Sequence, residues 1–315
     1  MKAAWGPGRG GGGSDAGGSD AGRRARAPAA PAVALVDTHA HLTDSRYDGD
    51  LEAVLGRAGA AGVTGIVVAG YDLPSSRAAV DLAARSPRIW AAVGIHPHDA
   101  AAAGAAALEE LAALAAHPRV VAIGECGLDF YRNRSPAADQ ARAFEAQLGL
   151  AARLGLPLIV HSREAMAETL RTLAAHPLPA GGVLHCFDGT AEDAARAVDL
   201  GLYLSCAGPL TYRRDPTLAR AVAAAPLERL VVETDCPYLS PAGHRGERNE
   251  PARVRDVAAA LAAVRGADLA AVAGATTRNA ARLFRTPALA GQPPAETAGP
   301  NGAPAATGAT MERVA

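Results

Sequence analysis

Histidines and acidic residues recur directly after short apolar segments of this chain. They are His39, His41, Glu125, His161, His185 and Asp235. Four imidazoles and two carboxylates are a sufficient ligand set for two divalent metal ions, because such ions take neutral imidazole nitrogens and carboxylate oxygens. The set therefore predicts a hydrolase that activates water with bound metal. It can do so only if one fold gathers residues spread from position 39 to position 235.

The elements that must position these residues are apolar, often β-branched segments. They are Ala34–Val36, Gly62–Val68, Ile89–Gly94, Val120–Ile123, Pro157–Val160, Gly182–Leu184, Leu202–Ser205 and Leu230–Val232. Stretches with helical spacing lie between them: Leu51–Ala61, Ser75–Ala84, Leu108–Ala116, Asp139–Leu154, Ala165–Ala175, Ala191–Leu200, Leu218–Ala225 and Arg253–Val264. A further helix is expected at Asp268–Ala273, leading into Thr276–Phe284 with Thr276 or Thr277 as N-cap.

Strands that alternate with helices predict parallel βαβ units, and eight such units predict a (β/α)8 TIM barrel, typically of about 250 residues. A barrel brings the C-terminal ends of its strands to one mouth, so the six side chains are expected to meet there. A doubly wound open sheet is the alternative. It is disfavoured because no GxGxxG motif opens a helix.

Composition separates the two ends of the chain from the middle. Residues 1–31 are rich in Gly, Ser, Ala and Pro, and residues 287–315 in Ala, Pro, Gly and Thr. Neither has apolar periodicity, so both are expected to be disordered tails around a single domain at 34–286. The chain has 315 residues and is 49% apolar, enough to bury a full core.

Charge and cysteine content exclude some classes of protein. Net charge is −1, so any polyanion site must be a local patch. Cys126, Cys186, Cys206 and Cys236 show no CxxC spacing, which favours buried thiols and a reduced, cytoplasmic setting. No run reaches the roughly 18 apolar residues of a membrane span. The sequence does not fix the oligomeric state.

Spacing supports the ligand assignment. Residues i and i+2 of a strand share a face, so His39 and His41 are expected to project together. Glu125 follows an all-apolar segment, where a carboxylate is costly unless it is paired or coordinated; a salt bridge to arginine is the alternative. A single histidine like His161 or His185 is more often a hydrogen-bonded core residue, but two in equivalent places favour ligands.

Two further acidic residues lie near the expected ligands. Glu233 and Asp235 share a face, and Asp235 is nearer the mouth, so the metal and general-base role is assigned to Asp235. Asp129 is expected to be structural, or to support a ligand. The only lysine is Lys2, so no carboxylated lysine of the folded domain can bridge two metals. Glu125 is then the natural bridge, because a carboxylate offers one oxygen to each ion.

These segments together resemble the TatD-like metal-dependent hydrolases, which have amidohydrolase-type barrels. The matching motifs are DTHAHL (37–42), AVGIHPHDA (92–100), AIGECGLDFYR (122–132), LIVHSREA (158–165), VLHCFDGT (183–190), VVETDCPYL (231–239), RGERNEP (245–251) and TTRNAARLF (276–284). The resemblance implies a (β/α)8 barrel and divalent-metal hydrolysis with DNase activity. It also implies that His39, His41, Glu125 and Asp235 bind one metal, and that Glu125, His161 and His185 bind a second.

The chain departs from the family pattern at several positions. Thr43 follows His41-Leu42 where many members have Asp, and Asp44 is a candidate to compensate. Asp188 stands in place of a usual Ser, and its charge is expected to weaken binding of an anionic substrate. Cys126 and Cys236 also depart from the pattern and are expected to point away from the ligands. None of these changes removes a ligand.

The hypothesis for activity is a deoxyribonuclease of the 3′-to-5′ exonuclease type, acting on single-stranded ends through a metal-activated water. Two divalent ions (Mg, Mn, Zn or Fe) would serve it, Glu125 and Asp235 would be catalytic, and Asp37 would orient a ligating imidazole. One alternative is a binuclear hydrolase of C–N or ester bonds. Another is a metal-bound nucleic-acid-binding protein with little turnover.

Residues on the mouth side suggest how a phosphate-bearing substrate is held. The candidates for substrate binding are His96, His98, Arg132, Arg163, Arg245 and Arg248, and Arg134, Arg213 and Arg214 lie in comparable places. A guanidinium fork suits phosphate oxygens, although an arginine-rich, lysine-poor chain carries surface arginines for no such reason. The aromatic residues Phe130, Tyr131, Tyr212 and Tyr238 can stack on bases or simply pack the loops.

Overall fold

The computed structural model describes residues 33–212 and 216–290. The expected tail at 1–31 lies outside the described residues, as does the larger part of the tail expected at 287–315. Arg213 and Arg214 lie outside them too.

Parallel strands form one sheet of eight in the part of the chain just defined, ordered as in the sequence. They are β1 (Leu35–Ala40), β2 (Val63–Ala69), β3 (Ile89–Val93), β4 (Val120–Asp129), β5 (Leu158–Arg163), β6 (Gly182–Leu184), β7 (Leu202–Cys206) and β8 (Leu230–Val232). The sheet closes where Ala40 forms a parallel bridge with Cys236, just after β8. The predicted TIM barrel is confirmed.

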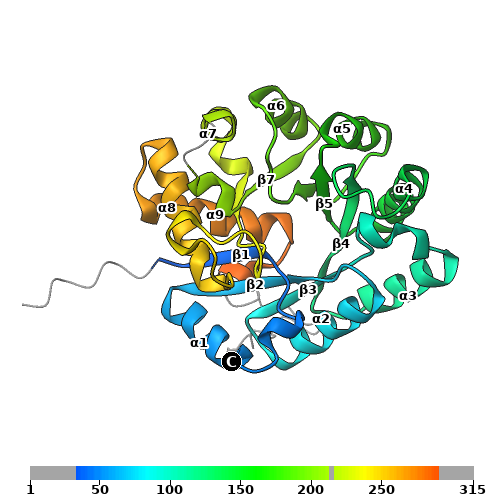
Figure 1. The fold of residues 1–315 in the computed structure, drawn as a ribbon, viewed down its shortest axis with the longest axis horizontal. Coiled ribbons are helices and arrows are strands. Elements are labelled where there is room, and N and C mark those ends of the chain that lie inside the picture. The colour runs from blue at the N-terminus through cyan, green and yellow to red at the C-terminus, as the bar shows by residue number, and fades with distance from the viewer. Residues whose placement is uncertain (1–32, 213–215, 291–315) are drawn as a thin grey trace, which may run out of the picture. The chain divides into compact units, whose positions relative to one another are not determined.

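Helices surround the strands and cover the outer face of the sheet (Figure 1). They are α1 (Leu51–Ala60), α2 (Leu73–Arg85), α3 (Ala105–Ala115), α4 (Ala137–Leu154), α5 (Met166–Ala175), α6 (Ala191–Asp199), α7 (Pro216–Ala224), α8 (Val254–Arg265) and α9 (Leu269–Leu283). Among the described residues no single helix is long and apolar enough to cross a membrane. The helices of the segment Pro251–Leu283 pass that test only as a pair bent by 112°.

Local sequence signals set several helix ends. Thr190 and Asp193 form a capping box at the start of α6, and Asp72 and Ser75 form one at the start of α2. In each, two side chains satisfy backbone N–H groups that the first helical turn leaves free. Helix α4 ends at Gly155, whose φ of +66° lies in the left-handed region that glycine adopts at little cost.

The last helix differs from the expectation. Helix α9 runs unbroken over Leu269–Leu283, and its N-cap is Asp268. The expected cap at Thr276 or Thr277 is therefore wrong. The Thr276 hydroxyl donates to a carbonyl one turn earlier, and that of Thr277 donates to Ala34 O at 2.9 Å. A threonine hydroxyl within a helix can also donate to a backbone carbonyl. A threonine in the sequence is therefore not by itself evidence of a helix N-cap.

The N-terminal end of the barrel, called the floor below, is packed with apolar side chains. Trp90, Leu283 and Phe284 are buried there with side chains from inside the barrel. The 3₁₀ helix η7 (Pro287–Ala290) adds Leu289, which is also buried. Leu289, which packs with the side chains under the strands, lies beyond the boundary expected at residue 286.

Candidate metal centre

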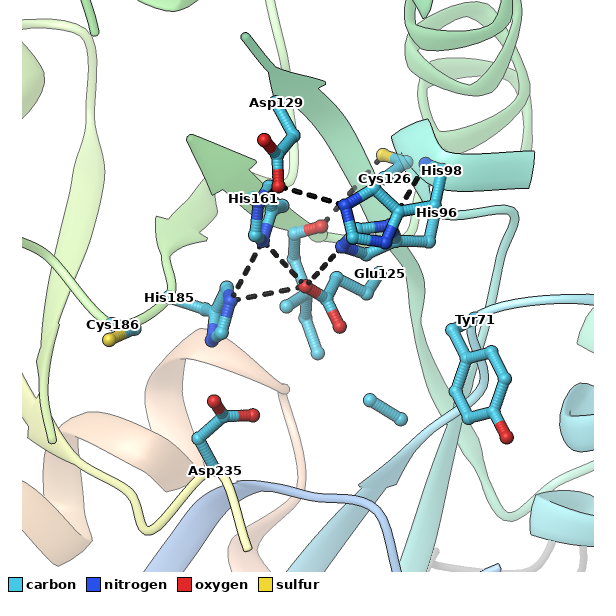
Figure 2. A network of polar contacts seen from close by, with 12 residues as sticks. Tyr71, His96, His98, Glu125, Cys126, Asp129, His161, His185, Cys186 and Asp235 are labelled. Atoms are coloured by element: carbon cyan, nitrogen blue, oxygen red, sulfur yellow. Dashed lines mark hydrogen bonds and ion pairs between the residues drawn. The ribbon is translucent and has the colours of Figure 1, made fainter. Parts of the chain in front are cut away.

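Glu125 lies at the mouth of the barrel, close to the predicted side chains of His161, His185 and Asp235 (Figure 2). Its Oε1 is 2.9 Å from His161 Nδ1 and 3.1 Å from His185 Nε2. Its Oε2 is 3.2 Å from His39 Nε2 and 3.5 Å from His41 Nε2. One carboxylate oxygen therefore faces each pair of histidines, as in a carboxylate that bridges two ions.

Asp235 joins this group on one side only. Its Oδ1 lies 3.3 Å from His41 Nε2 and 3.8 Å from His39 Nε2. Its side chain is 14% exposed, against 4% for Glu125. Asp235 is therefore the acidic group of the cluster that opens most to the pocket, whereas Glu125 is enclosed by imidazoles.

Glycines in β4 allow Glu125 to reach this position. The pairing of β4 with β5 shifts register between Ile123 and Cys126, and Gly124 and Gly127 flank Glu125 with φ of +133° and +141°. A side chain on Gly127 would overlap the carbonyl oxygen of a β5 residue. Glycine is the residue that tolerates both the positive φ and the close approach.

In a neutral imidazole, the hydrogen bond made by the ring nitrogen that points away from Glu125 decides the tautomer. The tautomer in turn decides whether the nitrogen that faces Glu125 carries a hydrogen or a lone pair. His185 Nδ1 lies 3.0 Å from Glu233 Oε1, and His41 Nδ1 lies 3.1 Å from Ala69 O. Both partners can only accept, so Nδ1 carries the hydrogen and Nε2 of each neutral ring faces Glu125 with a lone pair. In His161 the rear atom is Nε2, 3.3 Å from Asp129 Oδ2, and Nδ1 is the inner donor atom.

The inner nitrogens of the four ligand candidates converge in two pairs. The Nε2 atoms of His39 and His41 are 3.1 Å apart, and His161 Nδ1 is 3.3 Å from His185 Nε2. Nitrogens bound 2.0–2.1 Å from one ion are separated by roughly 3–3.4 Å. The residues therefore fit divalent metal, and within the described ranges two groups with donor atoms within 4.8 Å of one another are His39, His41, Asp235 and His39, Glu125, His185.

The charges of the cluster are consistent with competition between metal and protons. Burial opposes the charge on Glu125, but the surrounding histidines outweigh it and hold its pKa well below the usual range. Burial also opposes the imidazolium form of His185, yet Glu125 and Glu233 raise its pKa well above normal. Burial and the neighbouring His185 lower the pKa of His39. Metal that binds here displaces protons from the imidazoles.

His96 belongs to a third group of close donor atoms, with Glu125 and His161, but it differs from the ligand histidines. Its Nδ1 accepts a hydrogen bond of 3.0 Å from the backbone N–H of His98. The hydrogen of the neutral ring is therefore on Nε2, which lies 3.4 Å from Glu125 Oε1. His96 offers an N–H to the centre, where a metal ligand must offer a lone pair.

Acidic residues outside the ligand set contact the ring nitrogens of ligand histidines that point away from Glu125. Asp129 Oδ2 lies 2.9 Å from His98 Nε2 and also contacts His161. Asp129 therefore links the two rings and fixes the orientation of His161. Glu233 is buried and contacts both the His185 ring and the backbone N–H of Cys186. The sequence placed Glu233 on the face of Asp235 but did not identify its partner, His185, which directly follows β6.

Asp37 does not have its expected role. It accepts hydrogen bonds from the backbone N–H and the hydroxyl of Thr234, at 2.9 and 2.6 Å. Its only contact with a ligand histidine is 3.4 Å to the backbone N–H of His39. Burial raises its pKa to about 8, against the hydrogen bonds from Thr234. Asp37 thus ties β1 to the end of β8, and the expectation that it orients an imidazole is wrong.

Comparison with known proteins agrees with this geometry. The family model described as TatD related DNase matches residues 36–285. This chain belongs to the TatD-related DNase family. Metal-dependent hydrolase YabD of Bacillus subtilis is 42% identical over 252 residues, covering 80% of this chain and 99% of YabD. The 3′-5′ ssDNA/RNA exonuclease TatD of Escherichia fergusonii is 40% identical over 257 residues, with coverage of 79% and 98%.

Solved structures of TatD proteins share the fold. The TatD homologue YJJV from Escherichia coli K12 superposes with a TM-score of 0.77 at 34% identity, covering 80% of this chain and 98% of YJJV. A TatD-family hydrolase from Entamoeba histolytica gives 0.73 at 25% identity, with coverage of 81% and 99%. This chain is accordingly a metal-dependent hydrolase of the TatD family.

The metal centre of this TatD-family chain opens into a pocket of about 840 Å³. Besides the ligand candidates, its lining includes Tyr71, His96, His98, Arg132, Arg134, Arg163, Asp188 and Tyr238. The departures from the TatD pattern leave the centre intact. Asp44 pairs with Arg46 and takes no part in the close donor groups, and the Cys126 thiol contacts Ile159 O.

The predicted substrate arginines fall into two groups. Arg132 and Arg163 line the pocket. Arg248 is held by Asp50 in a bidentate ion pair, and Arg245 lies outside the pocket lining, over the ring of Tyr212. Neither Arg245 nor Arg248 lines this pocket, because position after strand β8 alone does not aim a long side chain into the mouth.

Proposed function

We propose that this chain is a divalent-metal-dependent exonuclease that removes nucleotides from the 3′ end of single-stranded DNA. The observation that carries the proposal is the combination of the carboxylate-bridged donor set with the arginine-lined pocket above it. The naming of relatives as 3′-5′ ssDNA/RNA exonucleases supports it, since such relatives align over nearly their whole length.

The ligand assignment follows the two oxygens of Glu125. His39, His41 and Asp235 would hold one ion with Oε2, and His161 and His185 would hold a second with Oε1. Mixed nitrogen and oxygen donors suit Zn, Mn or Fe, and Mg less well. When bound, such ions supply Lewis-acid polarisation of the phosphoryl oxygens and a water that deprotonates near neutral pH.

The chain's own residues supply proton transfer and positioning. Asp235 accepts the proton of the attacking water, because its carboxylate is the one most open to the pocket. Glu125 keeps its charge among the imidazoles and fixes the separation of the two ligand groups. His96 directs its N–H toward Glu125 Oε1, and Asp129 and Glu233 fix the tautomers of His161 and His185.

Electrostatics favour a phosphodiester over an amide or neutral ester substrate. Arg132, Arg134 and Arg163 line the pocket, and none of the three has an ion-pair partner among residues 33–212 and 216–290. A guanidinium with no carboxylate partner can bind phosphate oxygens without first breaking an ion pair. A substrate that carries no negative charge would leave these groups unused.

The test is a time course on single-stranded DNA labelled at its 5′ end. Purified protein is depleted of metal with a chelator and then loaded with Mg²⁺, Mn²⁺ or Zn²⁺. The expected result is a ladder shortened stepwise from the 3′ end with at least one metal, and no cleavage with chelator. Cleavage of a panel of amides and carboxylic esters with intact DNA would contradict the proposal. So would tight DNA binding without turnover under every metal.

A further inference from the structure

Tyrosines flank the metal centre on both sides of Glu125, two on one side and one on the other. Tyr71 and Tyr238 lie beside His41, with ring centroids 5.6 and 6.1 Å from it. They are therefore on the Oε2 side. Tyr131 lies on the Oε1 side, against Arg163, which follows His161 at the end of β5.

Two of these rings are exposed to an extent that packing does not explain. Tyr131 is 53% exposed and Tyr238 is 48% exposed. In the described part of the chain, Phe130 and Leu154 are the other large apolar residues with comparable exposure. An exposed aromatic ring beside a polar catalytic pocket is typical of a surface on which a base stacks.

Guanidiniums lie against both exposed rings, and Tyr131 has two of them, since Arg132 Cζ lies 5.5 Å from its ring centre. Arg163 Cζ lies 4.1 Å from the ring centre of Tyr131, and Arg46 Cζ lies 4.5 Å from that of Tyr238. A cation over one face of an aromatic ring holds the ring in place. Both rings are therefore oriented before any ligand binds, and about half of the surface of each stays exposed.

The two sides differ in charge. On the Tyr238 side, Arg46 is neutralised by Asp44 through two hydrogen bonds of 2.8 and 2.7 Å. The carboxylates of Asp72 and Asp44 also lie near Tyr71. That side is therefore neutral to negative.

The Tyr131 side is cationic. Arg132, Arg134 and Arg163 lie there without ion-pair partners among the described residues. Asp99, Asp129 and Asp188 line the same pocket, and Asp129 is already held by His98 and His161. Three guanidiniums against the carboxylates of Asp99 and Asp188 still leave this side with an excess of positive charge.

From this asymmetry we infer the path of the substrate: the 3′-terminal nucleoside stacks against Tyr238 and Tyr71, and the rest of the strand passes over Tyr131 and Arg163. The inference rests on the proposed exonuclease function. A terminal nucleoside carries no phosphate beyond the scissile one, so a neutral stacking site suits it. Each further nucleotide adds a phosphate, which the unpaired guanidiniums attract.

The test compares Michaelis constants for a dinucleotide and for a strand of about 15 nucleotides, near the upper site size of single-strand-binding folds. Tyr131→Ala and Arg163→Ala are expected to raise KM for the long strand about tenfold, and to raise it at least fivefold more than for the dinucleotide. Tyr238→Ala is expected to raise KM for both substrates by a similar factor. Arg163→Ala also lowers the dependence of KM on salt for the long strand.

Arg245→Ala is the matched control, because Arg245 lies 4.5 Å over Tyr212 in the same kind of stack but outside the pocket lining. It is expected to leave both constants unchanged. Equal effects of Tyr131→Ala and Tyr238→Ala on both substrates would overturn the path, and so would the reversed length dependence. If the wild-type protein cleaves neither substrate, the exonuclease proposal itself fails.

Discussion

The two ends of this barrel are buried to a similar degree but are held by different interactions. At the mouth, His39, Glu125 and His185 are 0%, 3% and 6% exposed, and at the floor Trp90 and Leu289 are 3% and 0% exposed. The floor is stabilised by removal of apolar surface from water. The mouth buries charges that satisfy one another only in part, which costs free energy unless a cation joins them.

Along the strands that lead to ligands, the residues at the mouth serve metal binding, and the residues at the floor serve stability. A strand of this barrel starts among apolar side chains and leads to ligands at its other end, as β1 does from Leu35 to His39 and to His41 directly after the strand. Substitutions at the mouth are expected to change metal binding and rate more than folding. Substitutions at the floor are expected to do the reverse.

The largest effect on activity is expected from Glu125→Gln. The amide cannot offer a charged oxygen to both ligand groups, so bound metal and its stabilisation of the transition state are lost together. We expect kcat/KM to fall by on the order of 10³-fold, equivalent to several kcal/mol. Steady-state nuclease assays and metal analysis check this. Far-UV circular dichroism should be unchanged, and near-normal metal-dependent activity would remove Glu125 from its assigned role.

A smaller loss is expected from Glu233→Ala, which removes the acceptor behind His185. Loss of such a partner costs about 10- to 100-fold in metal affinity or activity. Glu233→Gln is the matched variant, since its amide oxygen can still accept from His185 Nδ1, and it should recover most of the loss. A metal titration of the three proteins decides the point. If Glu233→Ala and Glu233→Gln lose metal affinity to the same extent, Glu233 does not act through the His185 imidazole.

His96→Asn separates the two hydrogen bonds of His96. The asparagine oxygen can replace Nδ1 as acceptor for the His98 N–H, but nothing replaces the inner N–H. We expect about a tenfold fall in kcat at unchanged metal content. His96→Gln, whose amide nitrogen reaches farther, should restore part of the rate. Loss of one metal equivalent in His96→Asn would instead identify His96 as a ligand.

The smallest effect on activity is expected from Leu289→Ala at the floor. The change empties a buried site beneath β2, where the Leu289 side chain packs close to Gly65. We expect destabilisation by about 2–3 kcal/mol with kcat/KM unchanged. Urea unfolding beside a nuclease assay tests both parts. A large loss of kcat/KM at a temperature where the protein stays folded would mean that the two ends are coupled.

Sequence periodicity was sufficient for the architecture. The apolar segments at Gly182–Leu184 and Leu230–Val232 became β6 and β8 with the same ends, because a short buried strand is defined by its own side chains. Element ends that depend on distant partners were missed. Strand β4 extends to Asp129 because it pairs with Arg163 of β5, and α9 begins at Asp268 although its threonines suggested a later start.

The sequence by itself determined which side chains lie at the mouth of the barrel. The direction of a strand and the alternation of its side chains between the two faces of the sheet are local properties of the backbone. Only the tertiary structure decided what each arriving group offers. The partner behind a ring fixes the tautomers of His96 and His185, and that partner lies on another segment or in a backbone turn. Arg163 has no carboxylate partner among the described residues, whereas Arg248 pairs with Asp50. A long side chain takes its charge partner from neighbours that sequence distance does not reveal.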